Sequence, residues 1–158
     1  MLIILKDAEG RTDVLSTFGA IALEHIESWM QANSLTVPHD LVEFWSQTGG
    51  GDLFDDSETI LRPTSIPSNY PGFVDGDDVH SATQFRIRSG MSPSYLLFHV
   101  GSFFSAVRLG DQMLVTLDDK FQETSEFSTF NEWYLRTLRA DYGEHYGLPN
   151  KVDNDEVC

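Results

Sequence analysis

The feature that most constrains this chain is a short helix whose two ends are both marked in the sequence. Pro38 suits the first position of a helix, where no backbone N–H is needed. Three consecutive glycines, at positions 49–51, can adopt the positive φ that ends a helix. The apolar residues between them lie three or four positions apart, which gives one buried stripe: Leu41, Phe44, Trp45 and Thr48. The sequence therefore predicts a short helix that stops sharply and leads directly into acidic sequence.

Other segments predict further helices around a sheet. Apolar residues recur at helical spacing from Thr17 to Met30. Asp77 is placed to cap a helix ending near Gly90. Thr129 begins the last helix, because Glu132 follows it at the spacing of a capping box, and Gly143 or Gly147 ends it. With 41% hydrophobic and 12% aromatic residues, the 158-residue chain has enough apolar material for one continuous core.

Runs of β-branched, aromatic and aliphatic residues predict the strands. A buried strand at residues 2–5 and a second near residues 14–15 would form an N-terminal hairpin. Later strands are expected at residues 58–63, 94–100, 103–109 and 113–117, the last three as an antiparallel meander. The predicted organisation is a single α+β domain, an antiparallel β-sheet packed with helices. It has an N-terminal strand or hairpin (1–16), the domain itself (17–142) and a loose acidic tail (143–158).

The helix led by Pro38, with its aromatic residues and its closing glycines, resembles a signature of the SUKH superfamily. Residues 95–101 (YLLFHVG) are similar to the central strand of that family, and residues 129–135 (TFNEWYL) to its last helix. The resemblance covers roughly residues 17–140 and implies a SUKH-like fold. The family includes bacterial immunity proteins that neutralise polymorphic toxins, cell-wall regulators of fungi and substrate-recruiting subunits of ubiquitin ligases. The resemblance therefore implies a role that needs no catalytic residue.

The charge of the chain favours a basic protein as partner. With 25 acidic and 10 basic residues, the formal charge is −15, which repels nucleic acid and anionic membranes and attracts basic proteins. The single Cys158 has no partner for a disulfide within the chain. Residues 1–5 are too short for a signal-peptide core, and no later apolar run is long enough to cross a membrane. The sequence thus predicts a cytoplasmic protein, and leaves its oligomeric state open.

We find no motif that supports catalysis or cofactor binding. The histidines form no pair with metal-ligand spacing, and no P-loop or nucleophile elbow is present. His25, on an apolar stripe, and His99, in a predicted strand, are expected to be hydrogen-bonded core or edge residues. The paired carboxylates are expected to be mostly solvated surface charges. We therefore predict a non-enzymatic chain with no catalytic residue, no metal site and no cofactor.

Acidic residues gather in segments that include turns and loops, and these form the predicted partner-binding site. If the fold brings them to one rim, their field would speed the encounter with a basic partner. Leu53, Phe54, Tyr70 and Phe73 could be packed anchors there, or alternatively fill the core while the acidity serves only solubility. The predicted site residues are Asp52, Asp55, Asp56, Glu58, Asp75, Asp77, Asp78, Asp118, Asp119 and Glu123.

Three classes of function remain in play on these grounds. The leading hypothesis is an immunity protein that binds and occludes a cognate toxin domain, which would be basic if it is a nuclease. The alternative is a regulatory or adaptor protein of the same family that recruits a host protein and neutralises nothing. An enzyme that uses surface carboxylates, such as a hydrolase, ranks last, and would lose turnover on a single Asp→Asn change while keeping its fold.

Overall fold

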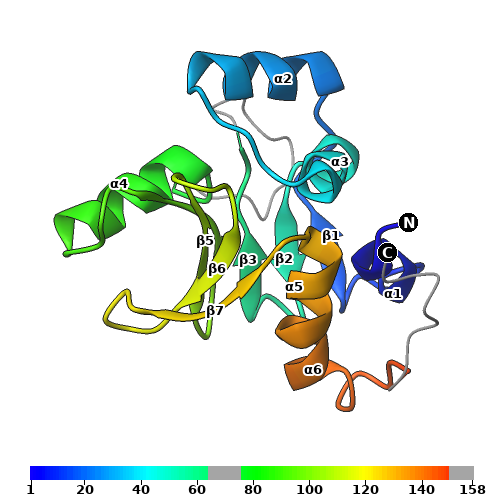
Figure 1. Cartoon of the computed structure of the whole chain (residues 1–158). Helices are drawn as coiled ribbons and strands as arrows, with labels where there is room; N and C mark the ends of the chain where they lie inside the picture. The colour runs from blue at the N-terminus through cyan, green and yellow to red at the C-terminus, as the bar shows by residue number, and fades with distance from the viewer. Residues whose placement is uncertain (64–75, 150–158) are drawn as a thin grey trace.

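A seven-stranded antiparallel sheet organises the chain, and its spatial order follows the order of the strands in the sequence (Figure 1). The computed structural model describes residues 1–63 and 76–149. Each strand pairs with the next one, as in a meander. The strands are β1 (Leu15–Thr17), β2 (Gly51–Leu53), β3 (Glu58–Ile60), β4 (Tyr95–Val100), β5 (Phe104–Arg108), β6 (Leu114–Leu117) and β7 (Glu123–Phe127).

Helices cover both faces of this sheet. The Phe104 ring of β5 lies 5.4 Å from the Arg86 guanidinium, whereas the next residue, Ser105, accepts a hydrogen bond from Trp133. Because successive residues of a strand point to opposite faces, the helices carrying Arg86 and Trp133 cover opposite faces. The helices are α1 (Ile3–Asp7), α2 (Leu23–Ala32), α3 (His39–Thr48), α4 (Val79–Arg88), α5 (Phe130–Arg136) and α6 (Leu138–Tyr142). The chain is a single α+β domain, as predicted.

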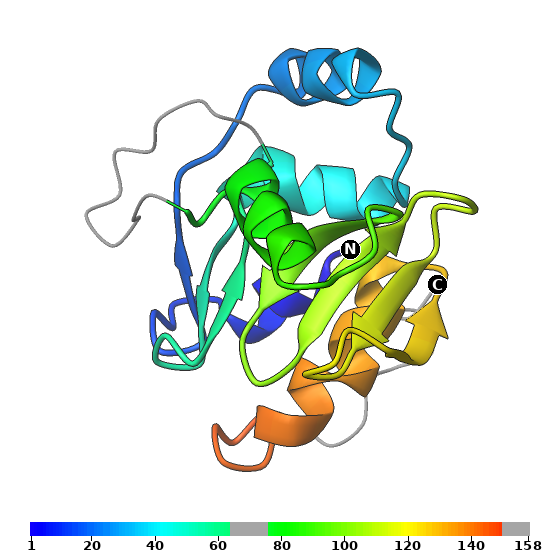
Figure 2. The same cartoon turned by 90° about the vertical axis from the view of Figure 1, so that its left-hand side faces the viewer.

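The helix marked by proline and glycine is present and buries its aromatic stripe. Pro38 lies at the N-cap position, one residue before its predicted place as the first residue of the helix, and Gly49 has the left-handed conformation that ends α3. Trp45 is fully buried, and its indole N–H donates to the carbonyl of Leu61 at 3.1 Å. A Cβ atom on Gly50 would lie 2.6 Å from a β3 carbonyl, so the glycines also allow α3 to end directly against the sheet. In Figure 2, α2 lies above α3, on the side away from the sheet.

The predicted strand at residues 2–5 is wrong, because this segment forms α1. The N–H of Ile3 donates to Oδ1 of Asn131 in α5 at 3.1 Å, which fixes the start of the helix. The apolar side chains are buried as expected, but a run this short has no periodicity that separates a helix from a strand. No N-terminal hairpin forms, since β1 pairs with β2 instead.

The first long helix begins later than its apolar pattern predicts. Its predicted start is residue 17, but α2 begins at Leu23. The N–H of Phe18 donates to the carbonyl of Gly50, and the N–H of Gly19 to that of Thr48, each at 2.9 Å. The N–H of Ile21, which would bond to residue 17 in a helix that began there, donates instead to the carbonyl of Ser46 at 3.0 Å. The segment before Leu23 is therefore bonded to the end of α3 and is not helical.

The later helices follow their predicted caps with local differences. Asp78, not Asp77, caps α4 by accepting the N–H of Ser81 at 3.0 Å. Thr129 caps α5 as predicted, through the N–H of Glu132. The predicted single last helix is two helices, because the backbone at position 137 leaves the helical conformation between α5 and α6.

Two other segments at the C-terminal side differ from what the sequence suggests. The sequence did not reveal β7, which lies at the edge of the sheet with mostly exposed residues. The first residues of the predicted tail fold back, since Leu148 is buried and its N–H donates to the carbonyl of Gly143 at 2.8 Å. Residues 150–158 of that tail lie outside the described residues.

Candidate protein-binding surface

The turn between β2 and β3 has an unusual backbone and carries two exposed acids. Three consecutive non-glycine residues have positive φ: Phe54 (52°), Asp55 (56°) and Asp56 (67°). The left-handed region is uncommon for side chains other than Gly, Asn and Asp, and costs on the order of 1–3 kcal/mol per residue. Both aspartates are exposed. We call residues 54–57 the acidic turn.

Two tyrosines from the C-terminal segment hold the acidic turn. The Phe54 ring stacks on that of Tyr142, with centroids 4.5 Å apart and the planes 4° from parallel. The hydroxyl of Tyr146 donates to Oδ2 of Asp55 at 2.7 Å, which raises the pKa of Tyr146 to about 12. The N–H of Asp55 donates to the carbonyl of Asp13 at 2.9 Å. The strained conformation is thus fixed by contacts from two separate parts of the chain, the segment at Asp13 and the C-terminal segment.

A second acidic turn lies at the same end of the sheet. The register places Phe104, at the start of β5, opposite Leu117, at the end of β6, so the β4–β5 and β6–β7 turns are neighbours. In a meander, alternate turns share one end, and the acidic turn between β2 and β3 shares it too. Asp118 and Asp119 follow β6 there, and Oδ1 of Asp118 accepts the N–H groups of two residues of its own turn.

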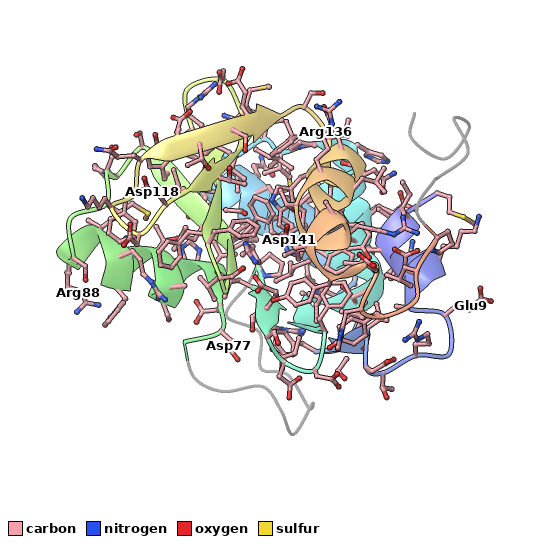
Figure 3. The ribbon with its side chains drawn as sticks, turned by 90° about the horizontal axis from the view of Figure 1, so that it is seen from below. Glu9, Asp77, Arg88, Asp118, Arg136 and Asp141 are labelled. Atoms are coloured by element: carbon pink, nitrogen blue, oxygen red, sulfur yellow. The ribbon has the colours of Figure 1, made fainter. Side chains whose placement is uncertain are left out.

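Helix α6 adds one more carboxylate to this end. Asp141 is exposed and directly precedes the tyrosine that stacks on the acidic turn. Although the residue is exposed, partial burial of its carboxyl group and the charge of Glu58 raise the pKa of Asp141. Figure 3 labels Asp118 and Asp141 in a view of the molecule from below, and the stacking of Tyr142 on Phe54 brings the segment of Asp141 to the acidic turn. We define the acidic end as Asp55, Asp56, Asp118, Asp119 and Asp141.

Other predicted site residues lie elsewhere. Asp77 and Asp78 are at the start of α4, at the opposite end of β3 from the acidic turn. Asp52 is half-buried in β2 and accepts the hydroxyl of Thr59 at 2.8 Å, and burial raises the pKa of Asp52. Glu123, on β7, is paired with Arg108. Asp75 lies outside the described residues.

The prediction of Glu58 as a surface contact is wrong, because its side chain is only 1% exposed. Oε1 accepts from Nε2 of His99 at 2.8 Å and from the N–H of Ser102 at 3.1 Å. Oε2 accepts the hydroxyl of Tyr142 at 2.7 Å. Burial by itself would raise the pKa of Glu58, but the hydrogen bonds from His99 and Tyr142 outweigh it and lower the pKa. The buried carboxylate is therefore fully hydrogen-bonded and charged.

The same buried cluster contains a chain of hydrogen bonds from a serine through a histidine to the glutamate. Nδ1 of His99 lies 3.0 Å from Oγ of Ser105, and that oxygen also accepts from Trp133 at 2.9 Å. Ser105 and His99 are both 0% exposed, so a substrate cannot reach the serine oxygen in this structure. The arrangement is a buried hydrogen-bond network, and it gives no support to hydrolysis.

The two histidines that were predicted to be hydrogen-bonded core or edge residues differ in burial. His99 is a hydrogen-bonded core residue, as predicted. His25 is exposed, so its prediction is wrong, because only Ile26 of α2 is buried. Within residues 1–63 and 76–149, no group of three or more His, Cys, Asp or Glu is arranged to hold a metal ion.

Two of the four predicted apolar anchors lie in the core and not on the surface. Leu53 and Phe54 are fully buried in the core, while Tyr70 and Phe73 lie outside the described residues. The residues that the sequence analysis missed are the two tyrosines that hold the acidic turn. Their spacing of four residues suggests a shared helix face, but gives no sign of the distant aspartate and phenylalanine that they contact.

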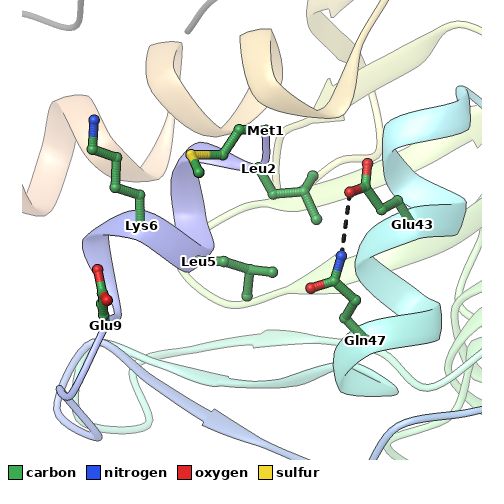
Figure 4. Close-up of a pocket in the computed structure, with 7 residues that line it drawn as sticks. All are labelled: Met1, Leu2, Leu5, Lys6, Glu9, Glu43 and Gln47. Atoms are coloured by element: carbon green, nitrogen blue, oxygen red, sulfur yellow. Dashed lines mark hydrogen bonds between the residues drawn. The ribbon is translucent and has the colours of Figure 1, made fainter.

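A hollow between α1 and α3 is a separate surface feature (Figure 4). Leu2 and Leu5 face the side chains of Glu43 and Gln47 across it. Two polar side chains of α3 pair with each other in this hollow, since the Gln47 amide donates to Glu43 at 3.2 Å. We assign no function to it.

No protein-family model matches the chain, and no curated protein matches it. The similarity to the SUKH superfamily therefore stays a prediction from the sequence motifs. In the described part of the chain, the helices are too short or too polar to cross a membrane.

Proposed function

We propose that the chain is a non-catalytic protein-binding module, and specifically an immunity protein that binds a basic toxin domain and blocks its active site by occlusion. The proposal rests on one observation above all: the acidic turn is held in a strained conformation by Tyr142 and Tyr146. The resemblance to SUKH immunity proteins agrees with this role.

The geometry of the acidic turn suits a binding loop. Residues held in sparsely populated backbone regions cluster at functional sites, where surrounding contacts maintain the strain. A loop that is already fixed loses little entropy when a partner binds, so more of the contact energy appears as affinity. Asp55 and Asp56 are thus presented to solvent in one orientation before any encounter.

The carboxylates of the acidic end differ from those around Arg108, because no basic side chain among the described residues neutralises them. On the sheet, Arg108 alone pairs with three acids, Asp111, Glu123 and Glu126. No ion pair within the described residues joins Asp55, Asp56, Asp118 or Asp119 to a basic side chain. Such carboxylates can accept charge-assisted hydrogen bonds from Arg and Lys of a partner.

The net charge of −15 supports the same kind of partner. An acidic surface accelerates association with a basic protein, and opposes wrong partners of like charge. Occlusion needs no reacting group on the immunity protein, which agrees with a serine and histidine that are sealed in the core.

The experiment that tests this proposal is affinity capture with the purified full chain as bait. A lysate of the source organism is passed over it at low salt, and bound proteins are eluted by stepwise salt and identified by mass spectrometry. We expect one stoichiometric partner with a basic toxin domain, whose activity the chain inhibits in a purified assay. Capture of a host regulator with no toxic activity would contradict the immunity role and favour the adaptor alternative.

A further inference from the structure

The hydrogen bonds around His99 allow one proton arrangement that satisfies every buried group. The Trp133 indole can only donate, so Ser105 Oγ accepts from it and directs its own hydroxyl to Nδ1 of His99. Nε2 of the imidazole then carries the proton and donates to Glu58. This is a neutral histidine beside a charged glutamate.

A second proton on His99 would break this arrangement. Nδ1 would become a donor, and the Ser105 hydroxyl would lose its acceptor in a site with no exposed surface. Burial lowers the pKa of His99, although Glu58 partly opposes this effect. The lost acceptor of Ser105 and the lowered pKa of His99 both indicate that the folded network disfavours the protonated imidazole.

The network is physically connected to the acidic turn. Tyr142 donates its hydroxyl to Oε2 of Glu58, and the same ring stacks on Phe54 of the turn. Glu58 also accepts the N–H of Ser102, which holds the β4–β5 turn. A Cβ atom on Gly101 would lie 2.1 Å from Oε1, so this turn packs directly on the carboxylate. One buried carboxylate therefore fastens two of the segments at the acidic end.

We propose that Glu58 and His99 form an acid-sensitive latch, which holds the acidic turn in its strained conformation at neutral pH and releases it when His99 is protonated. The latch is a property of the free protein. Its consequence, that a partner leaves the acidic end on mild acidification, rests on the proposed function.

The groups that face the latch set the direction of its response. His99 faces Glu58 of β3, Ser105 of β5 and Trp133 of α5. Besides His99, Glu58 faces Ser102 and Tyr142, and it feels the charge of Asp141. No cation is described among these neighbours, so protonation of the imidazole is the change that mild acid brings to the buried cluster.

The sign of the pH effect follows from linkage. An opened form exposes His99, which then takes up a proton near its ordinary pKa of about 6.5, whereas the closed form does not. Stability of the closed form is therefore present above about pH 6.5 and is lost as the pH falls below it. The opening equilibrium should rise about tenfold between pH 7.5 and 5.5. Glu58 adds to this loss only in more acidic solution, since its folded pKa is lowered from 4.5.

Nuclear magnetic resonance of the full chain tests the latch without any partner. Long-range proton–nitrogen spectra should show His99 neutral at pH 7, with the proton on Nε2. Amide hydrogen exchange, corrected for its intrinsic pH dependence, should show the protection of Ser102 and Ser57 falling about tenfold from pH 7.5 to 5.5. A protonated His99 at pH 7, or protection that does not change over this range, would overturn the proposal.

Two variants and one control variant sharpen the test. His99→Gln retains a donor for Glu58 but cannot be protonated, so the acid response should disappear, while His25→Gln on exposed α2 should leave it intact. Tyr142→Phe keeps the ring but removes the hydroxyl, and should loosen the acidic turn already at pH 7.5. A full acid response in a folded His99→Gln variant would refute the latch. If that variant does not fold, the spectra of the unaltered protein decide. Since no partner is involved, failure of the latch is distinct from failure of the immunity role.

Discussion

The side chain of Asp40 offers a sharp test of how the helices are joined, because it caps a helix that lies far away in the sequence. Asp40 is in the first turn of α3, and its two oxygens accept the N–H groups of Phe130 and Asn131, each at 2.9 Å. These amides begin α5 and have no partner within that helix. We predict that Asp40→Ala destabilises the fold by about 2–4 kcal/mol, since hydrogen bonds to charged groups contribute roughly 1.5–3 kcal/mol each and water can partly replace a half-buried acceptor.

Urea denaturation followed by circular dichroism measures this loss. Asp40→Asn keeps one oxygen acceptor but presents an NH₂ group to the second backbone amide. It should recover no more than half of the stability that Asp40→Ala loses. Thr129→Ala removes the local cap of α5 and should cost about 1 kcal/mol. Glu27→Ala, at an exposed position of α2, is the matched control and should cost about 0.5 kcal/mol or less. The reasoning is refuted if Asp40→Ala costs no more than Glu27→Ala.

Three further changes probe the core and the acidic turn. Trp45→Ala should lower the free energy of unfolding by about 3–5 kcal/mol in urea denaturation, because the indole is fully buried. The control Phe85→Ala removes a side chain that is 58% exposed and should cost under about 1 kcal/mol. Equal losses would contradict the burial of the indole. Gly50→Ala should lower the free energy of unfolding by at least about 2 kcal/mol, because of backbone strain and contact with β3. The control Gly10→Ala, also at positive φ but with open space around the new Cβ, should cost about 1 kcal/mol. A larger loss for Gly10→Ala than for Gly50→Ala would count against the packing of α3 on the sheet. Tyr146→Phe should shift amide resonances mainly in the acidic turn, and unchanged resonances there would show that its hydroxyl does not hold the turn.

Local signals in the sequence predicted much of the fold. Pro38 and Gly49 mark α3, and Thr129 marks α5, because caps depend on a few neighbouring residues. Strands β4, β5 and β6 could be predicted because Gly101–Ser102 and Gly110–Asp111 separate them.

The failures have equally physical causes. Strand β7 has four exposed residues out of five, so it lacks the apolar alternation that marks a strand. The burial of Glu58 depends on His99, 41 residues away, and on Tyr142, 84 residues away. No local pattern reports such pairings.

The position of the acidic segments could be predicted only in part, and their role in binding stays a prediction. Sequence patterns found acidic segments, but the register of the sheet decided which of them share an end. It separated Asp77 and Asp78 from Asp55 and Asp56, and placed Asp118 at the same end as the acidic turn. The strain of that turn could not be predicted, because it depends on contacts with a distant helix.

The most direct test of the central claim compares two pairs of charge removals in association kinetics with the captured partner. Asp55→Asn/Asp56→Asn removes two charges from the acidic turn, and asparagine tolerates the left-handed backbone as aspartate does. Glu24→Gln/Glu27→Gln removes two exposed charges from α2, so both double variants have the same net charge. At low salt, the first pair should slow association about tenfold or more and the second about twofold or less, with the difference shrinking at high salt. Equal effects of the two pairs would show that net charge alone attracts the partner, and would contradict binding at the acidic end.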